Sequence, residues 1–239
     1  MTRFDTTHWS MVLRTRGEEP DAHAALESLC RTYRPPVLAY IRARGHALDV
    51  AEDLTQGFFA SFIERTLYSQ ADPTRGRFRS FLLIALKHFL DDEADRQRTL
   101  KRGSAIQYAS LDAIDTCDSF GDTPQPITPE QVFERSWAQT VLRAALCKLH
   151  AETTAAGKAK LFGALSEFLI ECPSEDDYAR LAETLQMKRG TLAVAVHRLR
   201  ARLQACVRDE LAETAADSVS LGHEIEHMHK TLPGLLLRQ

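Results

Sequence analysis

Apolar residues recur at helical spacing along most of this chain, and the alternation typical of strands is almost absent. The spacing predicts helices over residues 22–45, 49–68, 76–101, 130–150, 157–171 and 176–212. The pair Pro35-Pro36 predicts a bend or short break in the first helix, because proline removes a backbone donor and restricts the residue before it. The sequence therefore predicts an all-α fold.

The helical periodicity fades over residues 103–129, which are rich in Gly, Ser, Asp, Thr and Pro. Such a composition is typical of a flexible tether. We therefore expect two small helical domains joined by a linker. The predicted boundaries are 1–102 for the first domain with an N-terminal extension, 103–135 for the linker, 136–212 for the second domain and 213–239 for a C-terminal tail.

Residues 178–203 have the pattern of two short amphipathic helices around a tight turn. In the second helix the apolar residues at i, i+4, i+7 and i+11 are Leu192, Val196, Leu199 and Leu203. The opposite face combines cations with small apolar groups: Ala193, Val194, His197, Arg198 and Ala201, with Arg200 and Arg202 at its margins. Cations neutralise phosphates, and small apolar groups can approach base edges. This pattern predicts a DNA-binding helix-turn-helix, although a helical hairpin with a solvated basic face would share it.

The net charge of −3 hides a strong local asymmetry. Residues 178–208 hold seven Lys or Arg against one acidic residue, whereas residues 209–239 hold six acidic residues against Lys230 and Arg238. A basic segment followed by an acidic tail fits a nucleic-acid-binding protein better than the overall charge suggests.

The five cysteines are odd in number, widely spaced and without a C-x-x-C pair. A disulfide framework or a cysteine zinc site is therefore not expected, and a reducing compartment is the default. No run in the chain approaches 18 apolar residues, and the N-terminus has no apolar signal-peptide core. We expect a cytoplasmic protein without a membrane partner.

Two charged features mark the predicted first domain. Asp49, Glu52 and Asp53 open a helix, where acidic side chains stabilise the positive end of the helix dipole. An acidic docking surface for a basic partner is the functional alternative. The stretch 74–102 places apolar residues between two groups of cations, which are Arg75, Arg77 and Arg79, then Arg96, Arg98, Lys101 and Arg102. Cations with interleaved aromatics suit single-stranded or partly melted nucleic acid, although a buried helix with solvated ends has the same pattern.

The order of these segments resembles that in a bacterial RNA polymerase sigma factor of the extracytoplasmic-function class. The helix DVAEDLTQGFFASFIE at 49–64 is similar to the region-2 helix that docks on the coiled coil of the largest polymerase subunit. GRFRSFLLIALKHFLDDEADRQR at 76–98 resembles the helix that captures and melts the −10 promoter element, and 178–203 resembles the region-4 helix-turn-helix that reads the −35 element. The resemblance covers about residues 22–102 and 136–212.

This resemblance implies a promoter-specificity subunit that performs no catalysis and needs no cofactor or metal. Its implied partners are core RNA polymerase, through the largest-subunit coiled coil and the flap of the second-largest subunit, and promoter DNA. Carried over by position, the polymerase-binding residues are Asp49, Glu52, Asp53 and Gln56, the −10 residues are Lys87, His88 and Arg96, and the −35 residues are Arg189, Thr191, His197 and Arg198. The alternative is a helix-turn-helix regulator that binds DNA without joining polymerase as a sigma subunit.

A threonine on the acidic helix is a candidate switch. The chain resembles in particular a sigma subgroup with TTHWS near the N-terminus, Thr6 to Ser10 here, and an EDLTQ-FF helix, Glu52 to Phe59 here. Members of that subgroup are associated with Ser/Thr protein kinases. Phosphate on Thr55 would add about −1.5 to −2 charge to an acidic face. We expect phosphorylation there to strengthen polymerase binding; the structural alternative is a mid-helix threonine bonded to its i−4 carbonyl.

The C-terminal tail contains His223-Glu224-Ile225-Glu226-His227, which matches the zinc-protease pattern H-E-x-x-H. The pattern lies in a short acidic tail, and nothing downstream offers a distant third ligand. We therefore expect neither catalysis nor a structural metal, and interpret the segment as a solvated or docking helix that covers part of either domain.

Overall fold

The computed structural model describes residues 20–71, 77–103, 127–169, 174–212 and 218–231, and this part of the chain is helical without a strand. The prediction of an all-α fold is confirmed. None of the described helices is long and apolar enough to cross a membrane. The predicted N-terminal extension as far as residue 19, most of the predicted linker (104–126) and residues 232–239 of the tail lie outside the described residues.

The first group of helices comprises α2 (Pro20–Ala43), α3 (Leu48–Glu64), a 3₁₀ turn η1 (Leu67–Gln70) and α4 (Phe78–Gly103). Helix α2 packs against α3, and α3 against α4. The two helices α3 and α4 approach closely at Gly57, where an added Cβ would lie 3.4 Å from Cζ of Phe89. Of the predicted bend or short break at Pro35 and Pro36 the break is absent, because α2 continues through both prolines. Tertiary burial of its neighbours, Tyr33 and Val37, offsets the cost of the two prolines.

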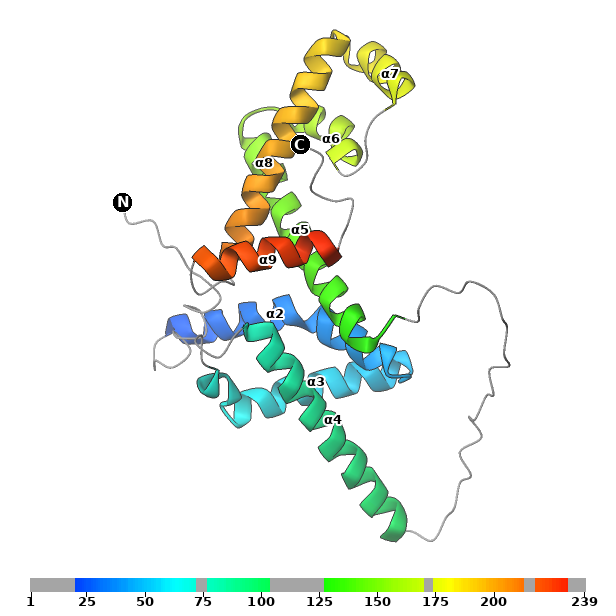
Figure 1. Ribbon diagram of the computed structural model, residues 1–239, viewed down its shortest axis with the longest axis vertical. Helices are drawn as coiled ribbons and strands as arrows, with labels where there is room; N and C mark the ends of the chain where they lie inside the picture. The colour runs from blue at the N-terminus through cyan, green and yellow to red at the C-terminus, as the bar shows by residue number, and fades with distance from the viewer. Residues whose placement is uncertain (1–19, 72–76, 104–126, 170–173, 213–217, 232–239) are drawn as a thin grey trace, which may run out of the picture.

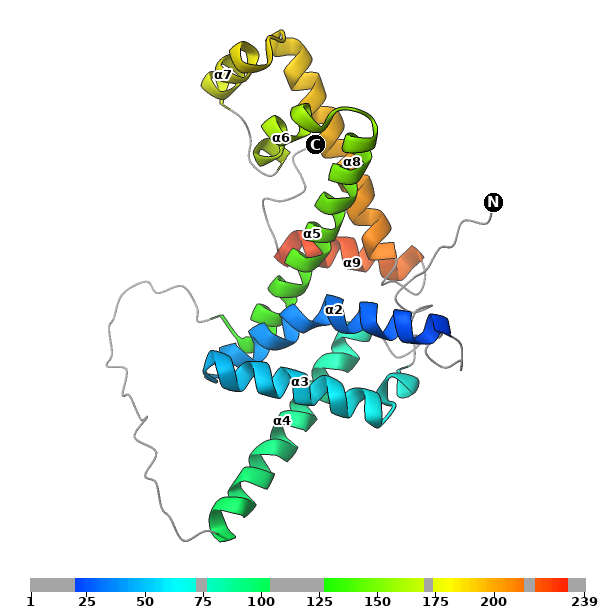
Figure 2. The same cartoon turned by 180° about the vertical axis from the view of Figure 1, so that it is seen from behind.

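The second group comprises α5 (Pro129–Ala155), α6 (Ala159–Leu165), a 3₁₀ turn η3 (Glu167–Leu169), α7 (Glu175–Leu185) and α8 (Arg189–Ala212). Helix α5 runs from α2 toward α6, and α8 lies alongside it (Figure 1). Residues 218–231 of the tail form a further helix, α9 (Ser218–Thr231), which contacts α5 and α8 and lies across them (Figure 2).

Helix α5 begins earlier than the predicted boundary between linker and second domain. A capping box fixes its start: the Thr128 hydroxyl accepts from Gln131 N at 3.2 Å, and Thr128 N donates to Gln131 Oε1 at 2.9 Å. Phe133, which the sequence places in the linker, is fully buried. Residues 129–135 are therefore helix and core: the predicted helix over 130–150 covers most of them, whereas the predicted linker boundary at residue 135 lies inside α5.

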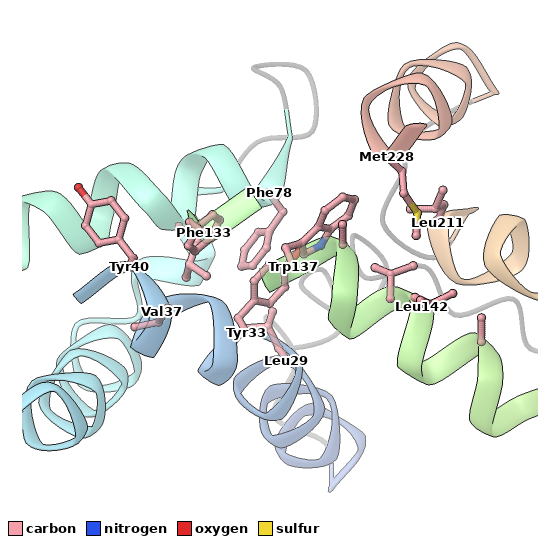
Figure 3. Close-up of a cluster of buried hydrophobic side chains, with 14 of the residues drawn as sticks. Leu29, Tyr33, Val37, Tyr40, Phe78, Phe133, Trp137, Leu142, Leu211 and Met228 are labelled. Carbon is pink, nitrogen blue, oxygen red and sulfur yellow. The ribbon is translucent and has the colours of Figure 1, made fainter. Parts of the chain in front are cut away.

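Helix α5 also joins the two groups of helices into one core. Tyr33 of α2, Phe78 of α4 and Trp137 of α5 gather at its centre, and Leu142, Leu211 and Met228 extend it toward α8 and α9 (Figure 3). The Tyr33 and Phe78 rings meet edge to face at 5.4 Å. Burying a large apolar side chain contributes roughly 1.5–3 kcal/mol, so this cluster supplies much of the free energy that holds α2, α4 and α5 together.

Candidate nucleic-acid interface

The helix-turn-helix predicted at 178–203 forms as α7 and α8, which pack against each other at one end of the molecule (Figure 1). A capping box opens α7: the Ser174 side chain accepts from Asp177 N at 3.2 Å, and the Asp177 carboxylate accepts from Ser174 N at 2.9 Å. The turn places Gln186 in the left-handed region at φ 51°, where the resembled family often has Gly. Leu192 and Val196 lie on the buried side of α8, as their spacing predicts.

The predicted −35 residues are exposed on α8, with Arg189 and Thr191 in its first turn and His197 and Arg198 two turns further on. Arg189, Thr191, His197 and Arg198 are all exposed, and Val194 is half exposed between them. No described residue forms an ion pair with Arg189 or Arg198. We call Arg189, Thr191, Val194, His197 and Arg198 the α8 face. It offers cations for phosphates, polar groups for base edges and an apolar centre.

Two further cations of α8 have structural partners instead. Arg200 donates from Nε and Nη2 to the Phe168 carbonyl at 3.0 and 2.7 Å, which ties α8 to η3. Arg202 forms a bidentate pair with Glu152 of α5 at 2.6 and 2.7 Å, and this hydrogen bonding holds the pKa of Glu152 below its usual value. Both lie at the margins of the α8 face and orient it, whereas a count of basic residues would have assigned them to DNA.

The predicted polymerase-binding residues also share one exposed face. Asp49, Glu52, Asp53 and Gln56 follow the i, i+3, i+4, i+7 spacing on α3, and all four are exposed. Two large apolar side chains beside them, Leu48 and Val50, are exposed as well. We call Leu48, Asp49, Val50, Glu52, Asp53 and Gln56 the α3 patch. Sequence reasoning found its charges and missed its apolar part, which combines with them into a surface suited to a basic, partly apolar partner.

Thr55 is buried in the core beneath α3, whereas the residues of this patch are exposed. Its side chain is 1% exposed, and its hydroxyl donates to the Ala51 carbonyl at 2.6 Å, as the structural alternative predicts. The helical spacing of the sequence predicts this burial, because Ala51, Thr55 and Phe58 share the apolar face of the helix. A kinase cannot reach this hydroxyl while α3 is packed as described.

The predicted −10 residues on α4 are not equally available. His88 and Arg96 are exposed, and Arg96 pairs only with Glu93 of its own helix at 3.1 Å. Lys87, however, points to α5, where its Nζ lies 2.7 Å from Glu130 Oε1. The hydrogen bond to Glu130 raises the pKa of Lys87 and keeps the ammonium charged.

The N-terminal end of α4 faces inward. Arg79 is buried: its Nε lies 2.8 Å from Glu134 of α5, its Nη1 contacts Glu224 of α9, and its guanidinium lies 4.0 Å above the Trp137 ring. Arg77 reaches the other oxygen of Glu224 at 3.1 Å. His227 of α9 lies 2.8 Å from Glu134. We call Arg77, Arg79, Glu134, Glu224 and His227 the arginine cluster; Arg75, the third predicted cation there, lies outside the described residues.

Burial and charge oppose each other within this cluster. Burial is the largest influence on Glu134 and raises its pKa. The hydrogen bond from His227 and the charge of Arg79 together outweigh it, so that the net pKa of Glu134 lies below the ordinary value. Tyr33 lies nearby in the core, and burial raises the pKa of its phenol. Glu134 is therefore a largely buried carboxylate that Arg79 and the hydrogen bond to His227 hold in its charged form.

The H-E-x-x-H pattern is divided among these contacts. Its glutamate, Glu224, binds arginines, and its second histidine, His227, binds Glu134, whereas His223 is exposed and accepts from Arg77 through its carbonyl at 3.5 Å. Within the described segments, no group of three or more His, Cys, Asp or Glu side chains could hold a metal ion. The tail is a docked helix, as one of the two sequence interpretations had it.

No family model, curated protein or solved structure matches this chain. The resemblance to sigma factors therefore stays a prediction from the sequence.

Proposed function

We propose that this protein is a sigma factor of the extracytoplasmic-function type, which binds core RNA polymerase and directs initiation at promoters with −35 and −10 elements. The observation that carries this proposal is the α8 face, an exposed basic and apolar surface on the second helix of a helix-turn-helix. The α3 patch supports it, since a regulator that only binds DNA has no use for an acidic and apolar docking surface.

Each residue of the α8 face has a distinct role in this proposal. Arg189 and Arg198 neutralise phosphates beside the −35 major groove, and Thr191 and His197 form hydrogen bonds with base edges. Val194 contacts apolar base atoms such as thymine methyl groups. Arg200 and Arg202 hold the helix in place through Phe168 and Glu152.

The α3 patch and the outer part of α4 supply the other two activities. Asp49, Glu52, Asp53 and Gln56 would bind the basic coiled coil of the largest polymerase subunit, with Leu48 and Val50 adding apolar contact. His88 and Arg96 would bind −10 DNA, and Lys87 would join them on leaving Glu130. That exchange replaces a half-exposed ion pair by a phosphate contact, so its energetic cost is small.

Phosphorylation of Thr55 would activate the protein, and the burial of its side chain requires that this side of α3 opens first. A phosphate cannot remain in a site that is 1% exposed, since transferring its charge out of water is too costly. The kinase would therefore act on a form in which this side of α3 is open, and the phosphate would hold α3 in that form. The switch is excluded if a Thr55→Ala protein binds core polymerase and transcribes like wild type in cells under inducing conditions.

The alternative, a helix-turn-helix regulator that does not join polymerase, is favoured by one observation. Arg77, Arg79 and Lys87 of α4 are paired with acidic side chains, so that the α8 face is the better exposed basic surface. The two functions differ in polymerase binding, because a plain regulator binds DNA without binding core enzyme.

The decisive experiment is run-off transcription with purified core polymerase on fragmented genomic DNA of the source organism, followed by sequencing of transcript 5′ ends. Wild type, Thr55→Ala, Thr55→Glu and kinase-treated protein are compared, with Arg198→Ala as a DNA-binding variant and Asp53→Lys as a polymerase-binding variant. We expect wild type to give transcripts with defined start sites. Arg198→Ala and Asp53→Lys should both lose these transcripts, and Arg198→Ala should still bind core polymerase. Absence of transcription in every form, phosphorylated protein included, would exclude a sigma factor; DNA binding without core binding would then indicate the regulator.

A further inference from the structure

The C-terminal helix α9 occupies the surface of α4 that carries its N-terminal cations. Glu224 is 3% exposed and uses both carboxylate oxygens, one for Arg77 and one for Arg79. A carboxylate held between two guanidinium groups takes the place that a phosphate of nucleic acid would take. Helix α9 therefore covers cations that belong, in sequence, to the predicted −10 helix.

We propose that α9 is an intramolecular competitor of nucleic acid: docked, it withdraws Arg77 and Arg79 from phosphate and fixes α4 against α5; released, it opens this end of α4 to a nucleic-acid backbone. The inference rests on the proposed function in that α4 is taken to bind nucleic acid. What it adds is a regulatory element, residues 218–231, and the cations on which it acts.

The anchors of α9 suit reversible docking. Its described side chains provide two buried anchors, Glu224 and Met228, with Leu221 and Ile225 packed at the margin. Helices of 14 residues are marginal when isolated, so α9 depends on its docking site to stay helical. A buried ion pair returns little net stability, because desolvation of both charges offsets their attraction. Docked and released forms are therefore close in free energy, and a polyanion can shift the balance between them.

Release of α9 would also loosen the contact between α4 and α5. Arg79 bonds Glu134 of α5 and Glu224 of α9 at once, and His227 bonds the same Glu134 oxygen, so that one network joins three helices. Met228 meets the core beside Leu211 of α8 (Figure 3). Among the described residues, two ion pairs would then still join α4 and α5: Arg79–Glu134 and Lys87–Glu130. The second pair is half exposed.

The test uses two glutamates of the same helix with the full chain. Glu224→Gln keeps size and removes the charge between the arginines, whereas Glu226→Gln makes the same charge change at a side chain that is 62% exposed and pairs only with Lys230 of its own helix. Both variants raise the net charge equally, so that a general electrostatic effect on binding is the same in each. Met228→Ala weakens docking without any charge change and guards against an effect of Glu224→Gln on folding.

Hydrogen exchange without nucleic acid measures docking directly. We expect Glu224→Gln and Met228→Ala to speed amide exchange of α9 at least about tenfold, and Glu226→Gln to leave it unchanged, since exchange follows local opening. Equal exchange of α9 in the Glu224→Gln and Glu226→Gln proteins would overturn the proposal, whatever transcription shows.

Binding to labelled single-stranded DNA measures the competition. We expect Glu224→Gln and Met228→Ala to bind about three- to tenfold tighter than Glu226→Gln, with a log K against log salt slope steeper by about one, because at least one cation is freed for phosphate. Faster exchange with unchanged DNA affinity would overturn competition and leave only a structural role for α9. If the same variant binds DNA more tightly but no form transcribes, the competition stands and the sigma function fails.

Discussion

The two ends of α4 carry the same kind of side chain in opposite surroundings. At the N-terminal end the Arg79 side chain is 2% exposed, packed on Trp137 and paired with carboxylates from α5 and α9. At the outer end Arg96 and Arg98 are 56% and 75% exposed, and among the described residues each forms its ion pair with an acid three residues before it. Being a basic residue of a predicted nucleic-acid helix therefore does not make an arginine available to nucleic acid.

The difference arises from partners that are distant in sequence. Glu134 and Glu224 lie 55 and 145 residues from Arg79, and the packing of α5 and α9 brings them to it. Helix α8 repeats the contrast on a smaller scale, with Arg189 and Arg198 open and Arg200 and Arg202 engaged. In both helices, contacts with other helices engage some of the cations. These contacts fix the position of the helix, and with it the position of the cations that remain exposed.

The largest test of this contrast is to remove the inner arginine. Arg79→Met keeps much of the volume but takes the buried guanidinium from both carboxylates, which leaves Glu224 with Arg77 and Glu134 with His227. We expect a loss of about 3–5 kcal/mol in the free energy of unfolding. Arg96→Met, the matched change at the outer end, should stay within about 0.5 kcal/mol. Urea denaturation followed by circular dichroism measures both. Similar values for the two would show that the inner cluster does not form.

The same contrast on α8 should appear in DNA affinity. Arg198→Ala removes an open cation of the α8 face, and we expect promoter binding about tenfold weaker, or roughly 1.4 kcal/mol. Arg202→Ala breaks the pair with Glu152 and should change stability by no more than about 1 kcal/mol, with little loss of affinity. Fluorescence anisotropy on one promoter fragment compares them. The assignment of Arg202 to structure fails if its loss weakens binding as much as that of Arg198.

Acid should weaken the inner end of α4 through Glu134. The pKa of Glu134 in the folded protein lies below its ordinary 4.5, because His227 and Arg79 outweigh the effect of burial. The charged carboxylate therefore stabilises the fold above about pH 4.5, and this stabilisation is lost as pH falls through the lowered pKa. We expect the stability difference between wild type and Glu134→Gln to shrink over that acidic range in denaturation series. A difference independent of pH would contradict this linkage.

The smallest effect is expected at Lys87, between the two ends. Its pair with Glu130 is 40% and 43% exposed, so Glu130→Gln should cost no more than about 1 kcal/mol of folding stability. The same variant frees Lys87 and should bind single-stranded DNA slightly more tightly. A loss above about 2 kcal/mol would place Lys87 with the inner arginines rather than between the two classes.

Sequence periodicity predicted local features well. It placed Leu192 and Val196 on the buried side of α8 and His197 and Arg198 on the opposite side, because a helix repeats every 3.6 residues whatever it packs against. Thr55 was within reach of the same reasoning, since it shares a face with Ala51 and Phe58. The acidic residues around it drew attention to its charge environment, although its position on the apolar face predicted burial.

The start of α5 shows where composition misled. Residues 127–135 follow a stretch rich in Ser, Asp and Pro, and the predicted linker therefore extended to residue 135, although the helical spacing began at residue 130. Thr128, Pro129 and Gln131 form a sequence pattern typical of a helix start: a capping residue, proline at the first position and glutamine three residues after the cap. No such pattern predicts that α2 and α5 share one core, because either helix could bury its apolar face against another partner.

By itself the sequence determined the helices, the exposed acidic face of α3 and the basic face of α8, because these follow from spacing within single helices. Tertiary structure alone decided which cations face solvent, that α5 seals both groups of helices into one core, and that the acidic tail docks on Arg77 and Arg79. The physical reason is that the fate of a charge depends on its solvation and its partners. Both are set by elements that meet only when the chain folds.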